Sequence, residues 1–142
     1  MSIFSSAERY SLDRNEWEAI PPMTSKRCRL GATAYKGKIY AAGGYDGAQF
    51  LSSVECFDPE TMTWSPVSPM NIRRCRVSLA SSGGILYAIA GFDGTSNLSS
   101  CECYRADVDA WELSPSLCSH AGGIAVGVVP IPADMLEPKL ES

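Results

Sequence analysis

The sequence predicts an all-β protein in which a unit of four strands is repeated. Three tryptophans, Trp17, Trp64 and Trp111, are spaced 47 residues apart along the 142-residue chain. A constant period of this length is typical of repeat folds, in which each copy forms one supersecondary unit. The same offset aligns a glutamate and an aromatic residue in each copy, namely Glu8, Glu55 and Glu102, and Tyr10, Phe57 and Tyr104.

Each copy is expected to contain four strands, because short segments with aromatic and β-branched side chains are separated by turn residues. In the first complete copy these segments are residues 30–35, 38–43, 53–57 and 63–67. Between the first and second strands, Lys36-Gly37 and its counterpart Gly83-Gly84 fit two-residue hairpin turns, which need positive φ.

The later strands carry the residues that should hold each unit together. The aromatic residue of the third strand and the tryptophan of the fourth are seven residues apart in all three copies. Across an antiparallel hairpin this spacing lets the two rings pack against each other. Glycines end the second strand where a side chain would be expected, which indicates close approach of another backbone. We therefore interpret nine repeated residues as structural: Gly43, Gly44, Gly91, Tyr10, Phe57, Tyr104, Trp17, Trp64 and Trp111.

A diglycine followed by an aromatic-Asp-Gly turn, a further aromatic residue and a tryptophan resembles the kelch motif of β-propeller proteins. Here the pattern is carried by residues 43–47, Phe57 and Trp64, and the likeness covers residues 7–129. Within that family the sequence is similar to the C-terminal part of the propeller in Kelch-like adaptors, which carry BTB and BACK domains upstream. The second copy departs from the pattern, with Ala90 in place of the first glycine, and no BTB or BACK sequence is present.

The resemblance implies a partial kelch-type β-propeller, with two complete four-stranded blades and incomplete blade strands at both ends. The predicted divisions are a partial blade of third and fourth strands (1–23), two kelch blades (24–70 and 71–117), the first strand of a further or closing blade (118–130) and a flexible tail (131–142). Propellers typically need four to eight blades to close a ring. We therefore expect an open segment with unprotected blade edges.

The composition argues against some classes of function. A formal net charge of −4 and a pI near 4.9 disfavour nucleic-acid binding, which needs a basic face. The longest apolar stretch, residues 122–132, is too short to cross a membrane, and the N-terminus lacks the pattern of a signal peptide. We therefore expect a cytoplasmic protein that binds neither nucleic acid nor membrane and needs no cofactor.

The cysteines and the histidine give no indication of a metal site or of catalysis. Four cysteines share the repeat period and are interpreted as small buried residues; they are Cys28, Cys75, Cys56 and Cys103. Cys101 and Cys118 do not repeat, so an exposed thiol at either position is a candidate redox sensor. His120 is the sole histidine, which leaves neither a multi-histidine metal centre nor an evident nucleophile and base pair. We predict no catalytic residue and no metal ligand.

Strand direction predicts where binding residues gather. In an antiparallel blade, the segment before the first strand and the loop between the second and third strands emerge on one face, which we call the loop face. Two Arg-Cys-Arg triplets and two aromatic-Asp-Gly turns should meet there. Arginine forks bind carboxylates and stack on rings, so this face suits an acidic peptide. The predicted partner-binding residues are Arg27, Arg29, Tyr45, Asp46, Arg74, Arg76, Phe92 and Asp93.

Two interpretations of these arginines stay open. They contact a partner, or they pair with Asp46 and Asp93 or face solvent, where ion pairs contribute little to stability. The resemblance to Kelch-like adaptors implies contact with a substrate peptide at four positions: Arg29, Arg76, Tyr45 and Phe92.

The sequence therefore predicts a protein–protein interaction module and no enzyme. The resemblance implies substrate recognition for a cullin-based ubiquitin ligase, with the cullin reached only through a BTB domain that these 142 residues lack. The alternative is a cytoskeletal kelch protein that binds actin filaments. A kelch-type enzyme is a third alternative, which the shortage of catalytic residues disfavours.

Overall fold

The structure, a computed structural model, describes residues 2–132, and these residues form ten strands and no helix. In chain order the strands are β1 (Ala7–Ser11), β2 (Glu16–Ile20), β3 (Gly31–Tyr35), β4 (Lys38–Ala42), β5 (Val54–Asp58), β6 (Thr63–Val67), β7 (Ser78–Ser82), β8 (Ile85–Phe92), β9 (Asn97–Arg105) and β10 (Ala110–Ser114). The all-β class is thus confirmed. The predicted flexible tail, residues 131–142, lies outside the described residues from 133 onward.

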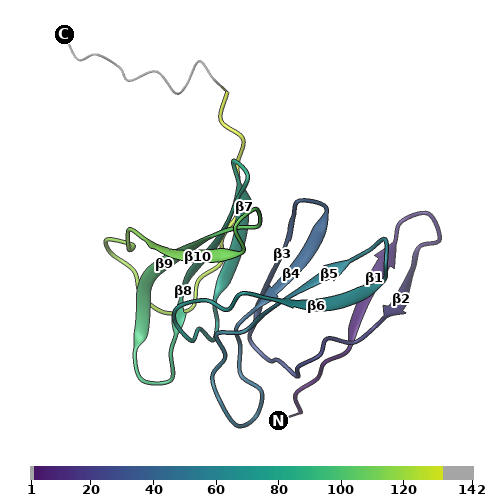
Figure 1. Cartoon of the computed structure of the whole chain (residues 1–142), viewed down its shortest axis with the longest axis horizontal. Coiled ribbons are helices and arrows are strands. Elements are labelled where there is room, and N and C mark those ends of the chain that lie inside the picture. The colour runs from purple at the N-terminus through teal and green to yellow at the C-terminus, as the bar shows by residue number, and fades with distance from the viewer. Residues whose placement is uncertain (1, 133–142) are drawn as a thin grey trace.

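The strands form three antiparallel sheets arranged as a fan (Figure 1). Blade 2 has the order β3-β4-β5-β6, blade 3 has the order β7-β8-β9-β10, and blade 1 contains only β1 and β2. The two strands of blade 1 stand one period before β5 and β6, so they are the third and fourth strands of an incomplete blade. β3 and β7, the first strands of the complete blades, lie side by side at the centre. Two complete blades and a partial one are therefore present, as the repeat predicts.

Turn residues set the strand ends. Lys36 and Gly37 have φ values of 48° and 75°, and Gly83 and Gly84 have 58° and 76°, as two-residue hairpin turns require. In the resulting register Tyr35 pairs with Lys38 at the end of the β3–β4 ladder. The observed bounds of β3 to β6 lie within one residue of the expected ones.

The hydrophobic core is formed where blade 2 and blade 3 pack face to face. The rings of Tyr35 and Tyr40 from blade 2 lie 6.2 Å and 5.7 Å from the ring of Tyr104 in blade 3. Leu86 and Ala88 of β8 are fully buried in the same cluster. A single antiparallel sheet with one apolar face needs such a cover, so each blade depends on its neighbour.

The paired rings of the third and fourth strands occur in all three blades, but their burial differs. The rings of Tyr10–Trp17, Phe57–Trp64 and Tyr104–Trp111 pack in tilted pairs, with 5.4, 5.1 and 5.0 Å between ring centroids. Trp111 is 7% exposed, whereas Trp17 is 67% exposed. The expected pairing is confirmed, yet Trp17 is not a core residue, because no described segment covers blade 1 on that side.

The segment 118–130, expected to form the first strand of a further blade, forms no strand. The carbonyl of Ile124 accepts a hydrogen bond from Ser78 Oγ, so the segment lies beside β7. A first strand is completed by pairing with the second strand of its own blade, and none is present among residues 2–132. The expectation of a strand here is therefore wrong.

Replacing Gly43 by alanine should lower the free energy of unfolding by more than about 3 kcal/mol. Gly43 has a φ of 66°, and a Cβ atom built there would lie 2.1 Å from the carbonyl oxygen of Arg74. Gly83→Ala is the matched control, because its φ is 58° but nothing lies within 4 Å of its Cβ position. The control should cost only about 1 kcal/mol. Urea unfolding of both variants measures the difference, and equal losses would contradict the close approach.

Trp111→Ala should cost about 3–5 kcal/mol of unfolding free energy, because a buried aromatic ring leaves a cavity. Trp17→Ala should cost less than about 1 kcal/mol, since the ring is mostly exposed. The two variants remove the same side chain from equivalent positions, so thermal unfolding compares burial directly. A large loss for Trp17→Ala would show that blade 1 is covered in solution.

Candidate functional site

The loop face is formed as strand direction predicts. In blade 2 the backbone groups of Cys28 and Tyr45 exchange two hydrogen bonds, at 2.9 Å and 3.0 Å. In blade 3, Cys75 and Phe92 do the same at 2.8 Å and 2.7 Å. Each Arg-Cys-Arg triplet is therefore held against the aromatic-Asp-Gly turn of its own blade.

A buried glutamate organises the start of blade 2. One carboxylate oxygen of Glu55, on β5, accepts hydrogen bonds from the backbone N–H and the hydroxyl of Thr24, at 2.7 Å and 2.6 Å. The other oxygen accepts a bond from Arg27 Nε at 3.0 Å. Arg27 Nη1 then donates to the carbonyls of Gly43 and Ser53, both at 2.9 Å. The ion pair thus ties together the segment before β3, the end of β4 and the start of β5.

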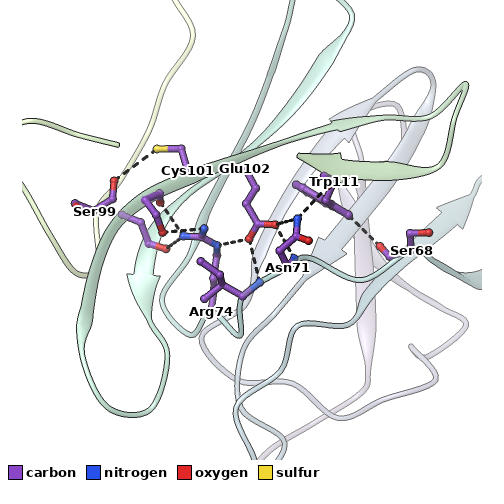
Figure 2. A network of polar contacts seen from close by, with 10 residues as sticks. Ser68, Asn71, Arg74, Ser99, Cys101, Glu102 and Trp111 are labelled. Carbon is purple, nitrogen blue, oxygen red and sulfur yellow. Dashed lines mark hydrogen bonds and ion pairs between the residues drawn. The ribbon is translucent and has the colours of Figure 1, made fainter. Parts of the chain in front are cut away.

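Blade 3 repeats this network one period later, and Figure 2 shows Glu102 between Arg74 and Asn71. Arg74 Nε donates to Glu102 Oε2 at 2.9 Å, and Arg74 Nη1 donates to Ala90 O and Ser100 O at 2.9 Å and 2.8 Å. Asn71 takes the place of Thr24 and also reaches the carbonyl of Trp111 at 3.0 Å. We call each such ion pair with its donors an Arg–Glu lock.

The prediction that Arg27 and Arg74 bind a partner is wrong, because the locks bury both side chains. The side chains of Arg27 and Arg74 are fully buried, so neither can be touched by a partner in this structure. Each guanidinium group is paired with a glutamate inside its blade, where burying an unpaired arginine would be costly. The signal that could have revealed this is the period itself, because Glu55 and Glu102 repeat with the two arginines.

The neighbouring arginines behave differently. Arg29 and Arg76 are exposed and have φ values of 55° and 56°, a left-handed conformation that is uncommon for arginine. The backbone N–H of Arg76 donates to the carbonyl of Arg29 at 2.8 Å, so the two residues lie side by side on adjacent blades. Neither side chain makes an ion pair with any residue between 2 and 132. Both guanidinium groups are therefore free to bind an external carboxylate.

An aromatic cluster adjoins these arginines, and it contains a residue that the sequence reasoning missed. Phe50 lies between Tyr45 of its own blade and Phe92 of the next, with ring centroids 5.0 Å and 5.5 Å away. All three rings are half-buried. Phe50 has Asn97 one period later, so the repeat does not single it out. Phe50 also packs closely against Gly94. A Cβ atom built at Gly94 would lie 2.7 Å from the Phe50 ring, so the loop after β4 and the loop after β8 are in tight contact.

The two aspartates of the loop face hold turns. Oδ1 of Asp46 accepts backbone N–H bonds from the residues two and three positions further on, both at 2.8 Å, and Asp93 repeats this at 2.7 Å. These bonds hold the pKa of each carboxyl group below its ordinary value. Neither aspartate forms an ion pair with an arginine among the described residues. Asp46 and Asp93 therefore shape the loops, as Asx turns do.

The remaining reactive side chains do not gather into a site. Cys101 is buried, so the expectation of an exposed thiol there is wrong, whereas Cys118 is exposed. Among the repeated cysteines, Cys56 and Cys75 are buried as predicted, while the other two are only half-buried. Within residues 2–132, no three His, Cys, Asp or Glu side chains lie close enough to hold a metal ion. The same residues contain no helix that could span a membrane.

The lock of blade 2 should make stability depend on pH. Burial acts to raise the pKa of Glu55, but hydrogen bonds from Thr24 and Arg27 and the charge of Arg27 outweigh it, so the pKa lies below its ordinary value. A lowered pKa stabilises the folded state above the unfolded value of about 4.3. This contribution is lost as the pH falls through the folded pKa.

We therefore expect Glu55→Gln to lower the free energy of unfolding by about 3–5 kcal/mol at pH 7, because Arg27 is left unpaired. The same variant should show a weaker loss of stability between pH 5 and pH 3 than the unchanged chain. Urea unfolding at several pH values measures both effects. Glu60→Gln, at an exposed turn position, is the control and should keep the original pH dependence. An unchanged pH dependence in Glu55→Gln would contradict the role of this carboxylate.

Comparison with known proteins agrees with the geometry. The family model for the Kelch motif matches residues 26–71 and 73–117, which is more than half of the chain. Kelch-like protein 8 of Mus musculus is 43% identical over 51 residues, covering 36% of this chain and 8% of the relative. Kelch-like protein 8 of Caenorhabditis elegans is 42% identical over 50 residues (35% and 7%), and human Kelch-like protein 3 is 38% identical over 43 residues (30% and 7%).

These alignments span less than a tenth of the relatives' length, so they inform on the repeat and not on the relatives' other parts. The repeated motif, the four-stranded blades and these relatives support a protein-interaction module of a kind that is typically non-enzymatic. The chain belongs to the kelch-repeat family, and its blades resemble those of Kelch-like adaptor proteins.

Proposed function

We propose that this chain is the substrate-recognition part of a Kelch-like adaptor and that its loop face binds an acidic segment of a partner protein. The observation that carries the proposal is the pair of exposed arginines, Arg29 and Arg76, which lie side by side and make no ion pair with residues 2–132. Two adjacent guanidinium groups can each donate a pair of hydrogen bonds to a carboxylate.

Arg29 and Arg76 keep a left-handed backbone although they are not glycines, as do five other residues between 2 and 132. A left-handed φ at a residue other than glycine costs about 1–3 kcal/mol and persists at sites where the conformation is used. Glycine at position 29 or 76 would avoid this cost. The same strain occurs in both blades, so the outward direction of the guanidinium group is a repeated property of the loop face.

Charge and aromatic surface on this face fit one kind of ligand. The chain has a net charge of −4, yet Arg29 and Arg76 are exposed together on the loop face. Acidic segments are therefore attracted to the loop face and repelled elsewhere. Tyr45 and Phe92 flank the arginines as half-buried rings and would contact apolar side chains next to the acidic residues of the ligand.

The proposed cellular role follows from the resemblance to Kelch-like adaptors. Recruitment of a cullin-based ubiquitin ligase would need a BTB domain outside these 142 residues, so this chain would select the substrate only. The proposal includes a cytoplasmic location. Actin-filament binding is the alternative, and it needs no acidic ligand on the loop face.

The double variant Arg29→Ala/Arg76→Ala should lose binding to acidic peptides without losing its fold. Selection from a displayed random peptide library on the unchanged chain should enrich Asp- and Glu-rich sequences. The double variant should bind the selected peptides at least about 30-fold more weakly, because two charge-assisted contacts are removed. Arg105→Ala, an exposed arginine beside the turn between β9 and β10 on the opposite face, is the matched control and should bind normally.

Selection of neutral or basic peptides, or equal binding by the double variant, would refute recognition at these arginines. Cosedimentation with actin filaments that is unaffected by an excess of the selected peptide would favour the cytoskeletal alternative instead. Circular dichroism of both variants shows whether a loss of binding reflects a loss of folding.

A further inference from the structure

A polar hollow lies on the loop face, beside the aromatic cluster. It has a volume of about 250 Å³ and is formed by the loop between β4 and β5 and by the segments ahead of β3 and β7. Phe50, the middle ring of the cluster, is part of its wall. Neither Arg29 nor Arg76 lines the hollow, so it is separate from the pair of free arginines. The polar side chains in its lining include Ser25, Asp46, Ser53 and Arg73.

The donor groups of the hollow are not used by the fold. Ser25 donates through its backbone N–H to Glu55 at 3.3 Å, and Ser53 accepts through its backbone carbonyl from Arg27. Neither serine hydroxyl is hydrogen-bonded to any residue between 2 and 132. Arg73 is exposed and forms no ion pair with those residues. Two hydroxyls and one guanidinium group can therefore donate to a ligand.

Ser53 differs from its counterpart in blade 3. There, Arg74 Nη2 donates to Ser100 Oγ at 3.0 Å, one period after Ser53. In blade 2, Arg27 Nη2 lies 3.0 Å from Glu55 Oε2 but makes no hydrogen bond with residues 2–132. The hydroxyl of Ser53 thus stays outside the lock and lines the hollow instead.

Ser25 is also a departure from the repeat. Its counterpart one period later is Ile72, which is half-buried. An apolar side chain therefore fits the blade at this position, and folding does not require a hydroxyl there. A serine at position 25 makes the hollow polar where the repeat would allow an apolar surface.

The charges around the hollow favour a neutral polar ligand group. Backbone N–H bonds occupy only Oδ1 of Asp46, so Oδ2 remains to accept from a ligand. An acidic group would be repelled by Asp46, and a basic group would be repelled by Arg73. A carboxamide avoids both repulsions, because its oxygen accepts from Arg73 and the serine hydroxyls while its NH₂ group donates to Asp46.

We propose that the hollow binds the carboxamide side chain of a glutamine or asparagine in the partner segment. In the proposed function, on which this inference rests, an acidic residue of the same segment binds Arg29 and Arg76. Phe50 lines the hollow and also packs against two rings that adjoin these arginines, so the segment would cross the Phe50 ring. The partner is thereby narrowed to acidic segments that carry a carboxamide at a fixed distance from the acidic residue.

The displayed random peptide library tests this ligand directly. Peptides enriched on the unchanged chain should carry Gln or Asn at a constant spacing from the acidic residue. In a synthetic copy of one such peptide, replacing the carboxamide residue by alanine or by glutamate should weaken binding about tenfold or more in calorimetry. Arg73→Ala in the chain should cause a similar loss for the original peptide and almost none for the alanine peptide.

Two further chain variants separate recognition from folding. Asp46→Asn keeps a side-chain oxygen for the turn but removes the charge, so the glutamate peptide should regain affinity for this variant. A merely structural role of Asp46 would not change the preference between the two peptides. Lys26→Ala removes the residue one period before Arg73, which does not line the hollow, and should leave binding unchanged.

The outcomes distinguish this inference from the proposed function. Enrichment of neutral or basic peptides would refute both. Acidic peptides without a carboxamide at constant spacing, or equal binding of the original and alanine peptides, would overturn the carboxamide site alone. An equal loss for both peptides in Arg73→Ala would also overturn it, because Arg73 would then act on the acidic residue.

Discussion

The Arg–Glu lock is the interaction on which the rest of this structure depends. Each lock places an ion pair where side-chain exposure is 2% or less. A pair in such surroundings is tolerable only when the remaining donors and acceptors are satisfied. The carboxylate therefore collects backbone and side-chain donors from the segment ahead of the blade, and the guanidinium collects carbonyls from two strand ends. One ion pair thereby fixes three separate pieces of chain.

The lock also determines what the loop face presents. Arg27 is drawn into the blade and Arg29 is exposed two residues later, and the chain between them pairs with Tyr45. This change of direction is accompanied by the left-handed φ at Arg29. The buried Arg27–Glu55 pair makes the frame rigid, and Arg29 beside it exposes its guanidinium group. A binding surface on loops is well positioned only when such a frame supports it.

Much of the fold could be predicted because its determinants are local. Turn residues such as Lys36-Gly37 and the seven-residue spacing of Phe57 and Trp64 act within one hairpin, so the strands and ring pairs follow from short stretches of sequence. The burial of Arg27 could not be predicted this way, because arginine is usually exposed and its partner Glu55 lies 28 residues away. The exposure of Trp17 depends on what covers blade 1, which is a property of the neighbour and not of the residue.

Residues that depart from the repeat and arginines that follow it contribute to the loop face in different ways. Phe50, with Asn97 as its counterpart, joins two loops at one place only, so a surface built from repeated blades becomes asymmetric there. Arg29 and Arg76 do repeat, but so do Arg27 and Arg74, and periodicity alone cannot separate the two pairs. What separates them is solvent exposure, because Arg29 and Arg76 are exposed whereas Arg27 and Arg74 are buried in the locks. In this chain, then, an exposed repeated arginine without an ion pair among residues 2–132 is evidence of recognition, whereas a repeated arginine buried in a lock is evidence of assembly.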